Sequence, residues 1–456
     1  MIPGEPREGS LERPGYRAVA YPRPKLPNGE DALMPGGVAV DPASGRVFIA
    51  SMKLGRIFAL EDPTGDGREA RYVDWTRGLF QDALSLHAEP GELWVLHRRN
   101  LTRLTDADGD GLADRFERML ALPHGKADDY DFGYGLAREP DGVFVFGYAP
   151  YAHRKLEGSG GGVRVRPGHE YRPEEIASGL RNPVGWCLGP EGDVFCTDNQ
   201  GEWVATNKLC HADGKRYHGF PNPERRPPEG TKVSPPAVWV PYDWARSLNG
   251  VTFDATGGKF GPFAGQIFIA ELMFGGAVIR ASLEKVAGEW QGACFPFWGK
   301  GLLGPLTLAF GPDGRLWVGS ITEPGWMAQP DRGGLFRIDF TGDVPFEIET
   351  IRALPGGFRI VFTRKPDGGT LSAESFAVES WRYEHTAAYG SPEYDRARAA
   401  VSGCRPSPNG LGVDLEVNDL RAGRVYKVSA PGVRSAESEP LVHPVGVYTL
   451  NAVPGG

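Results

Sequence analysis

The segment VAVDPASGRVFIA, residues 38–50, has a pattern that returns five more times along the chain. An alternating apolar strand leads into a Pro/Gly turn, and the residues after the turn include an aliphatic side chain directly followed by an aromatic one. The later copies begin at Leu84, Tyr134, Gly185, Val251 and Leu306. Because successive side chains of a strand point to opposite faces, each copy predicts a β-hairpin with one buried face.

The spacing of the copies predicts the architecture. Their aromatic residues are Phe48, Trp94, Phe144, Phe195, Phe268 and Trp317, separated by 46, 50, 51, 73 and 49 residues. A four-stranded propeller blade takes roughly 40–50 residues. The long interval contains an insertion over about residues 201–236. The period therefore predicts a six-bladed β-propeller.

Further strands complete the blades. In the first unit RIFAL (56–60) and RYVDW (71–75) follow the hairpin as third and fourth strands. The sixth unit has no fourth strand after Phe340, whereas Tyr16–Tyr21 has the pattern of one and precedes the first unit. We therefore expect the N-terminal strand to close the ring, since closure leaves no open sheet edge between the chain ends.

The C-terminal quarter has a different sequence pattern from the repeats. Short alternating strands separated by Pro, Gly and Ser turns fill the last 110 or so residues, without a cysteine pair of the antibody type. This pattern predicts an immunoglobulin-like β-sandwich. The fold class is thus all-β, with a propeller over residues 1–342 and a sandwich over residues 343–456.

Composition narrows the function classes. The chain has 456 residues, 64 of them Gly and 40 Pro, and a net charge of -8. An acidic chain without a basic patch argues against a nucleic-acid partner. No apolar run is long enough to span a membrane. The N-terminus lacks a signal-peptide core, so either the protein is cytoplasmic or the chain begins after a removed signal.

Strand order sorts the loops onto two faces. Connections from strand two to three and from strand four to the next blade share one face, here the top face, and the third-to-fourth connections lie on the far face. One far-face loop matches the calcium-binding D-x-D-x-D-G pattern with Glu at its twelfth position. Its predicted ligands are Asp106, Asp108, Asp110, Leu112 through its carbonyl, Asp114 and Glu117. The alternative is a polar turn stabilised by Asp side chains.

The top face collects aromatic, amide, cationic and imidazole groups. Aromatic rings stack on a ligand while polar groups orient it, so the set predicts a site for a sugar or another small polar ring. The candidates are His97, Arg98, Arg99, His153, Arg181, Asn182, Gln200, Trp203, Trp244, Asn249, Lys300 and Trp326. For any one of them the alternative role is to satisfy backbone groups of the propeller.

One stretch resembles a known family. GLRNPVGWCLGPEGDVFCTDNQG (179–201) resembles the signature of the glucose/sorbosone dehydrogenase superfamily, whose members use pyrroloquinoline quinone (PQQ) on a six-bladed propeller. The segment at 197–223 and the tail containing YGSPEYD (389–395) are similar to a subgroup common in planctomycete and verrucomicrobial genomes. The resemblance implies a carbohydrate substrate, a periplasmic or extracellular location and, because no cytochrome module is present, an external electron acceptor.

The resemblance also implies residue roles. Arg181 and Asn182 match the Arg-Asn pair that contacts the quinone, and Arg98 and Lys300 are further cations for its carboxylates. The place of the family's general-base His is taken by Asp131. A carboxylate accepts a proton if burial raises its pKa, so Asp131 is a candidate base, with His97 and His153 as alternatives.

Three functions remain open from the sequence. The first is a PQQ-dependent sugar or aldose dehydrogenase. The second is a quinone-independent enzyme on sugars, a polysaccharide lyase or a hydrolase of oxidised sugars, which needs an Arg for a uronate and a proton acceptor. The third is a non-enzymatic carbohydrate-binding propeller. Fold alone does not decide among them.

Overall fold

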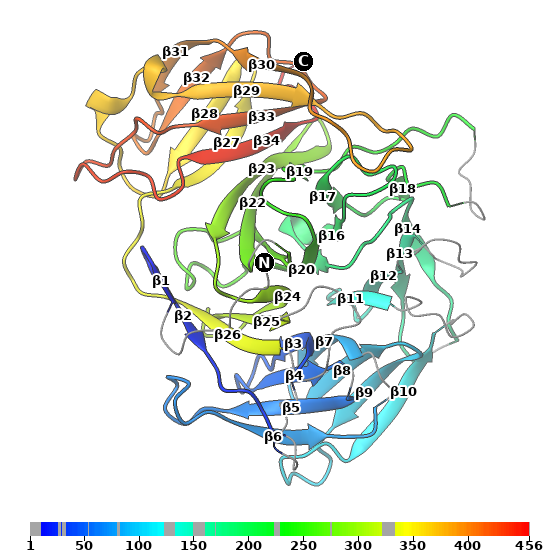
Figure 1. Cartoon of the computed structure of the whole chain (residues 1–456). Helices are drawn as coiled ribbons and strands as arrows, with labels where there is room; N and C mark the ends of the chain where they lie inside the picture. Colours follow the sequence, from blue (N-terminus) through cyan, green and yellow to red (C-terminus); the bar gives the residue numbers. More distant parts are fainter. Residues whose placement is uncertain are drawn as a thin grey trace.

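The structure, a computed structural model, describes residues 11–25, 29, 33–52, 54–79, 83–122, 133–148, 160–168, 170–222, 229–273, 276–321 and 333–455. Within these ranges the regular elements are β-strands and three short 3-10 turns. Six antiparallel sheets surround a common axis, and a further pair of layers stands outside them (Figure 1). The predicted all-β class and the six blades are confirmed.

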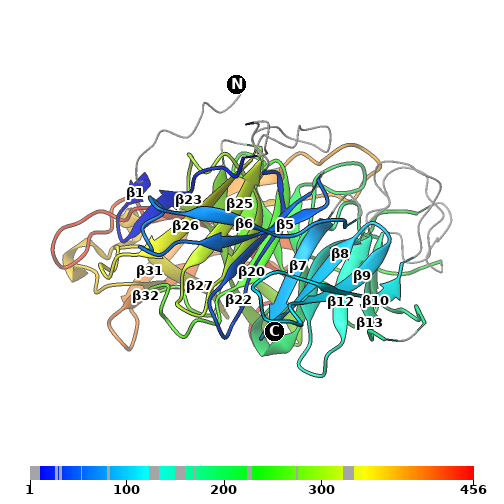
Figure 2. The same ribbon diagram turned by 90° about the horizontal axis from the view of Figure 1, so that it is seen from below.

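The first three blades follow the repeat. Blade one contains β3 (Pro35–Val40), β4 (Val47–Ser51), β5 (Arg56–Glu61) and β6 (Arg71–Thr76). Blade two contains β7 (Ala83–Glu89), β8 (Glu92–His97), β9 (Asn100–Thr105) and β10 (Arg115–Ala121). Blade three contains β11 (Gly133–Arg138), β12 (Phe144–Tyr148), β13 (Gly161–Val165) and β14 (Glu174–Ser178). Figure 2 shows the disc edge-on, with blade two on its near side.

The other three blades contain the insertion and the irregular strands. Blade four contains β15 (Trp186–Leu188), β16 (Val194–Asp198), β17 (Asn207–His211) and β19 (Val238–Val240). Its insertion holds β18 (Arg216–Tyr217), which pairs in parallel with β14 of blade three. Blade five contains β20 (Leu248–Phe253), β21 (Ile267–Glu271), β22 (Ala277–Val286) and β23 (Glu289–Trp298). Blade six contains β24 (Gly304–Phe310), β25 (Leu316–Ile321) and β26 (Gly333–Phe340).

The N-terminal strand closes blade six as predicted. β2 (Tyr16–Ala20) pairs with β26, Tyr16 opposite Phe340 and Ala18 opposite Ile338, and β1 (Leu11–Arg13) adds an outer strand. Tyr16 is buried among Phe260, Phe263 and Phe297 of blade five. Aromatic packing thus reinforces the hydrogen bonds that join the two ends of the propeller.

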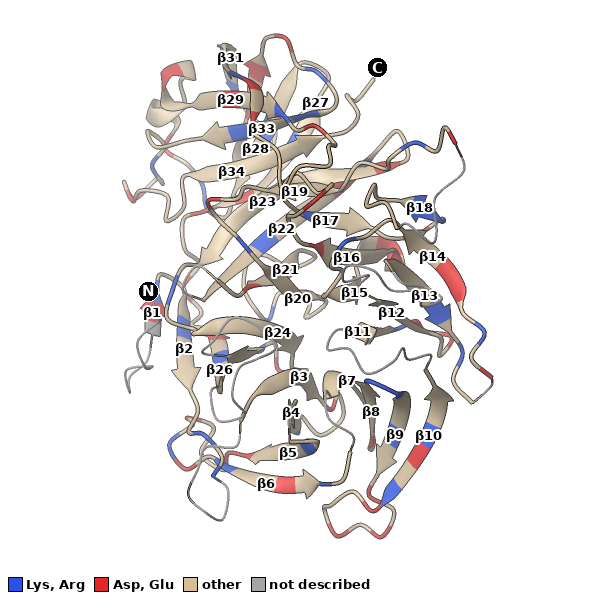
Figure 3. Ribbon diagram, turned by 45° about the vertical axis from the view of Figure 1, so that its right-hand side comes forward, with Lys and Arg blue, Asp and Glu red and all other residues tan. Residues whose placement is uncertain are grey.

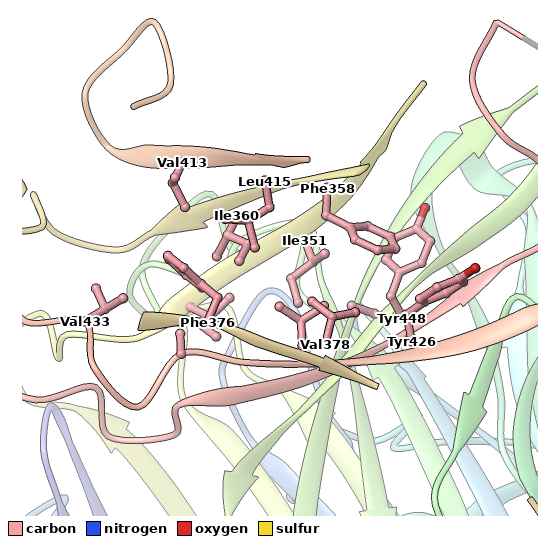
Figure 4. Close-up of a cluster of buried hydrophobic side chains, with 14 of the residues drawn as sticks. Ile351, Phe358, Ile360, Phe376, Val378, Val413, Leu415, Tyr426, Val433 and Tyr448 are labelled. Carbon is pink, nitrogen blue, oxygen red and sulfur yellow. The ribbon is translucent and has the colours of Figure 1, made fainter. Parts of the chain in front are cut away.

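The C-terminal residues form two packed four-stranded sheets. One contains β27 (Ile348–Leu354), β28 (Gly357–Phe362), β32 (Gly412–Val417) and β31 (Val401–Pro406), and the other β34 (Val445–Leu450), β33 (Arg424–Ser429), β29 (Ala377–Arg382) and β30 (Tyr394–Ala399). Their facing side chains make one apolar core, including Ile351, Phe358, Val378, Tyr426 and Tyr448 (Figure 4). The immunoglobulin-like class stays a prediction, as does the boundary at 342/343, which lies between β26 and β27.

The sandwich is joined to the propeller through a shared sheet. β23 of blade five pairs with β34, Gly292 opposite Thr449 and Cys294 opposite Val447, so that eight strands run from the axis into the sandwich. Arg280 of β22 is fully buried between the rings of Phe263 and Phe295, 4.0 and 4.2 Å from their centroids, and donates to the Ile348 and Glu349 carbonyls of β27.

The axis is narrow, and most of the strands that line it carry no charged residue. Four of the six innermost strands, β3, β15, β20 and β24, carry no charged residue, whereas outer strands such as β6, β10 and β14 do (Figure 3). The axial channel has a volume of about 80 Å³ and is lined by all six inner strands. Met34, Met52, Leu84, Tyr134, Leu306 and Ile321 form an apolar cluster at the top-face ends of their strands. Among the described residues no helix is long and apolar enough to cross a membrane.

Candidate functional site

The Arg181-Asn182 motif is held on the top face by a buried carboxylate. It lies in the connection from β14 to β15, three residues before Val184, which lines the axial channel. Asp198, at the end of the neighbouring β16, accepts hydrogen bonds from the backbone N–H groups of Arg181 (3.1 Å) and Asn182 (2.7 Å). Asp198 is fully buried, and its other oxygen lies 3.3 Å from Nζ of Lys208. The backbone of the motif is therefore fixed whether or not a ligand is bound.

The Arg181 side chain is held by two partners. Its Nε and Nη2 donate to one carboxylate oxygen of Glu202, at 3.3 and 3.2 Å. Its guanidinium carbon lies 5.5 Å from the ring centroid of Tyr389. A Cβ on Gly201 would come within 1.9 Å of Nε, so a side chain there would displace the guanidinium. Glycine at 201 is thus a steric requirement of this arrangement.

Tyr389 comes from the sandwich. The loop between β29 and β30 reaches the top face, where Tyr389 forms a bridge with Glu202 and the Gly390 N–H donates to the Gly201 carbonyl at 2.9 Å. Tyr389 is 62% exposed, so much of its surface is open to a ligand. No sequence pattern places this residue beside Arg181, although the YGSPEYD tail that contains it carries part of the family resemblance.

Asn249 and Gln200 lie near this motif and bond mainly to the backbone. The Asn249 carbonyl accepts from the Thr197 hydroxyl (3.0 Å), and its buried amide donates to the Ser247 carbonyl (3.0 Å). Gln200 donates to the Ala205 carbonyl at 3.2 Å. Both side chains thus satisfy backbone groups of the propeller, which was the alternative to a role in the site. Contacts of Asn249 and Gln200 with a substrate stay predictions.

The remaining described candidates lie outside the Arg181 motif. Trp203, which directly follows Glu202, lines a pocket against the sandwich. Trp244 packs on the core shared by blades four and five. Lys300 is exposed between β23 and β24, and Arg98 is half-buried in the β8–β9 turn.

His97 is enclosed at the top-face end of β8. It is 3% exposed, and its Nε2 lies 3.0 Å from the Thr102 hydroxyl. Burial lowers the pKa of His97 to about 4, so the imidazole is neutral at pH 7. A neutral imidazole can accept a proton, but this one has little access to a substrate. Asp131, His153 and Trp326 lie outside the described residues.

Three carboxylates of the far-face loop converge. Oxygens of Asp106, Asp108 and Asp110 lie within 4.8 Å of one another between β9 and β10, as the strand order predicts. Asp114 accepts from the Ala107 N–H at 2.7 Å. Glu117 instead pairs with Arg103 and Arg115, at 2.5 and 2.7 Å. Calcium binding by this set, with Leu112 and Glu117 included, stays a prediction.

Comparisons with known proteins find similar structures. No family model and no curated protein matches the chain. A protein of Thermus thermophilus assigned as an oxidoreductase (glucose dehydrogenase) matches with a TM-score of 0.52 at 20% identity, over 71% of this chain and 100% of its own. The PQQ-bound aldose sugar dehydrogenase of Streptomyces coelicolor matches with a TM-score of 0.51 at 16% identity, over 72% and 99%.

A fungal enzyme matches as well. A Trichoderma reesei member of Carbohydrate-Active Enzymes Family AA12, described in a calcium structure, has a TM-score of 0.51 at 11% identity, over 73% of this chain and 98% of its own. At these identities the likeness concerns the fold. The chain therefore has the β-propeller fold that PQQ-dependent sugar dehydrogenases also have.

Proposed function

We propose that the protein is a PQQ-dependent dehydrogenase of sugar CH–OH groups, with its site on the top face at the mouth of the axial channel. The observation that carries the proposal is the rigid Arg181-Asn182 motif beside this mouth, on a propeller fold shared with sugar dehydrogenases. The substrate would be a carbohydrate, and the electrons would leave to an external acceptor.

The described residues could hold part of the PQQ molecule. A ligand pocket usually has about 300 Å³ or more, so the 80 Å³ channel is too small and the quinone would lie above it, on the apolar cluster that includes Tyr134. The pair of Arg181 with Glu202, which is 55% exposed, contributes only about 0–1 kcal/mol. A cofactor carboxylate could therefore replace Glu202 at small cost.

Each residue then has a defined task. Arg181 would bind one carboxylate through its planar fork, and the Asn182 amide, whose donors and acceptor have no partner among the described residues, would orient a polar edge. Bound PQQ would supply the two-electron acceptor for the sugar. Lys300 and Arg98 stay our proposals for the other carboxylates, and Asp131 or His153 for the base.

The test is reconstitution. The purified chain is incubated with PQQ and calcium, and reduction of dichlorophenolindophenol is followed with glucose, other aldoses and short oligosaccharides. We expect sugar-dependent reduction that requires added PQQ. The absence of reduction with every sugar, in protein shown to have bound PQQ, would contradict the proposal.

One observation favours a second function. The exposed Tyr389 ring beside Arg181 suits a uronate, whose ring stacks on the aromatic face while the carboxylate pairs with the guanidinium. A polysaccharide lyase needs such a contact. Release of unsaturated products from polyuronates without PQQ, measured by ultraviolet absorbance, would identify this activity.

A further inference from the structure

A second pocket lies where blade four meets the sandwich. It has a volume of about 140 Å³, and its lining includes Trp203, Trp239 and Lys208 from the propeller and Tyr383, His385 and Asn451 from the sandwich side. Two aromatic contacts shape its walls. Trp203 lies 5.1 Å from His385 and Trp239 lies 5.2 Å from Tyr383, measured between ring centroids.

Trp203 adopts a backbone conformation that is unusual for its residue type. It is the second central residue of a two-residue turn in which the backbones of Gly201 and Val204 bond to each other in both directions at 3.1 Å. Its φ is 64°, a value at which a turn normally has Gly. A bulky residue there costs about 1–3 kcal/mol and points to a functional constraint. The turn thus places an indole at the pocket at the expense of local stability.

The pocket also contains a buried imidazole with incomplete hydrogen bonding. His218 is 1% exposed, lines the pocket and lies beside the buried Cys210 thiol, and neither of its ring nitrogens has a hydrogen-bond partner of normal length among the described residues. Lys208 is 3% exposed, donates to the His218 carbonyl at 3.0 Å and pairs with Asp198. A buried imidazole with incomplete hydrogen bonding is costly unless a ligand or water bonds to it.

These features define the ligand. An engineered cavity of about 150 Å³ holds one benzene molecule, so the pocket of 140 Å³ takes no more than one six-membered ring, and the hydroxyl groups of a sugar ring would extend out of its mouth. Aromatic walls suit the C–H face of a ring. The side chains of His218, Ser234 and Thr449 offer donors and acceptors, and Asn451, whose amide N–H groups already bond to Pro236 and Trp290, offers its Oδ1 as an acceptor. The lining cation Arg424 bonds to Ser380 and to the Asp395 carbonyl, and Glu384 pairs with Arg382, so no ligand charge is demanded.

We infer that this pocket is a saccharide-binding site that holds one neutral sugar ring. Its wall residue Trp203 directly follows Glu202, the partner of Arg181, so the pocket adjoins the Arg181 motif on the top face. A saccharide chain held here would extend toward Arg181. Under the proposed function, on which this consequence rests, the preferred substrate is an oligosaccharide rather than a free monosaccharide.

The test measures binding without PQQ and without turnover. Saturation-transfer NMR with cellotriose, maltotriose and xylotriose on the full chain reports saccharide binding directly. Trp203→Gly removes the indole and leaves the residue that the turn prefers, so this variant should fold with an unchanged or higher melting temperature. Glu191→Gly is the matched control, because Glu191 also has a positive φ (61°) and lies in the turn between β15 and β16 on the far face.

We expect at least one trisaccharide to bind, with affinity lowered about tenfold or more in Trp203→Gly and unchanged in Glu191→Gly. The inference is overturned if none of the three binds, or if Trp203→Gly binds as tightly as the parent. Because no redox step is involved, failure of the dehydrogenase proposal would leave this result standing.

Discussion

At the scale of single residues, Arg181 shows what a sequence can and cannot reveal. Its position on the top face follows from the strand order, and its backbone anchor Asp198 is close in sequence. Its other neighbour, Tyr389, belongs to the sandwich, and no local pattern links the two. The motif could therefore be predicted, whereas the composition of its surroundings depended on how the sandwich docks.

His97 illustrates a different limit. Its position at the end of a second strand was predictable, but its burial was not, because burial depends on the packing of neighbouring loops. The consequence is a pH dependence of stability. The folded pKa of about 4 lies below the ordinary value of 6.5, so the unfolded chain takes up a proton that the folded chain does not. Stability is retained above pH 6.5 and falls as the pH drops toward 4.

We predict that His97→Gln removes this dependence. Glutamine does not titrate and can still bond to Thr102. Between pH 7 and 4.5 the free energy of unfolding should fall by about 2–3 kcal/mol more in the parent than in the variant. Urea denaturation at a series of pH values measures the difference. Parallel curves for the two proteins would show that His97 is not held neutral by burial.

At the scale of elements, the repeat predicted the strands well. The hairpins, the third strands outside blade four and the closing strand appear where alternation and turn residues place them, because each blade is specified locally; β17 of blade four was not predicted. β18 was missed since its two residues are too short to show a pattern and pair with another blade. The insertion that carries it was recognised only as a break in the period.

The far-face loops link neighbouring blades. Arg46 of blade one donates to the Gly111 carbonyl of the blade-two loop at 3.0 Å, and Arg337 of blade six donates to Gly65 of the equivalent blade-one loop at 2.8 Å. These loops therefore contribute to the packing of the ring. A metal ion bound to one of them would stabilise the fold rather than take part in chemistry on the opposite face.

We predict that Asp108→Ala lowers the melting temperature in calcium buffer and leaves ligand affinity nearly unchanged. Without calcium the variant should be as stable as the parent or more so, because the substitution relieves repulsion among three close carboxylates. Thermal unfolding in calcium and in chelator measures both effects. The prediction would be contradicted if calcium did not change the melting temperature of the parent protein, or if the variant stayed folded but lost activity.

At the scale of the whole molecule, propeller and sandwich share one sheet and one buried cation. Arg280 bonds to Gln266 and to two carbonyls of β27, and it is enclosed by two phenylalanine rings. The sequence predicted strands on both sides of this joint but not the joint itself, since β23 and β34 pair only in the folded chain.

We predict that Arg280→Met lowers the free energy of unfolding by about 3 kcal/mol, because it leaves buried carbonyls without donors. Arg352→Met, an exposed substitution on β27, is the control and should change it by less than about 0.5 kcal/mol. Calorimetry of the three proteins gives the comparison. Equal stability of the two variants would show that Arg280 does not secure the domain junction.

The central claim is that PQQ binds at the Arg181 motif. The most direct measurement is isothermal titration calorimetry, in which PQQ is added to the apo-protein in calcium buffer. The parent, Arg181→Ala and Arg172→Ala are compared. Arg172 is the control because it is exposed on the far face between β13 and β14. Losing one charged hydrogen bond to a ligand costs about 1.5–3 kcal/mol. We therefore predict that Arg181→Ala binds PQQ roughly ten- to a hundredfold more weakly, with little change in melting temperature, and that Arg172→Ala binds like the parent. Failure of the parent to bind PQQ, or equal affinity of all three proteins, would contradict the account.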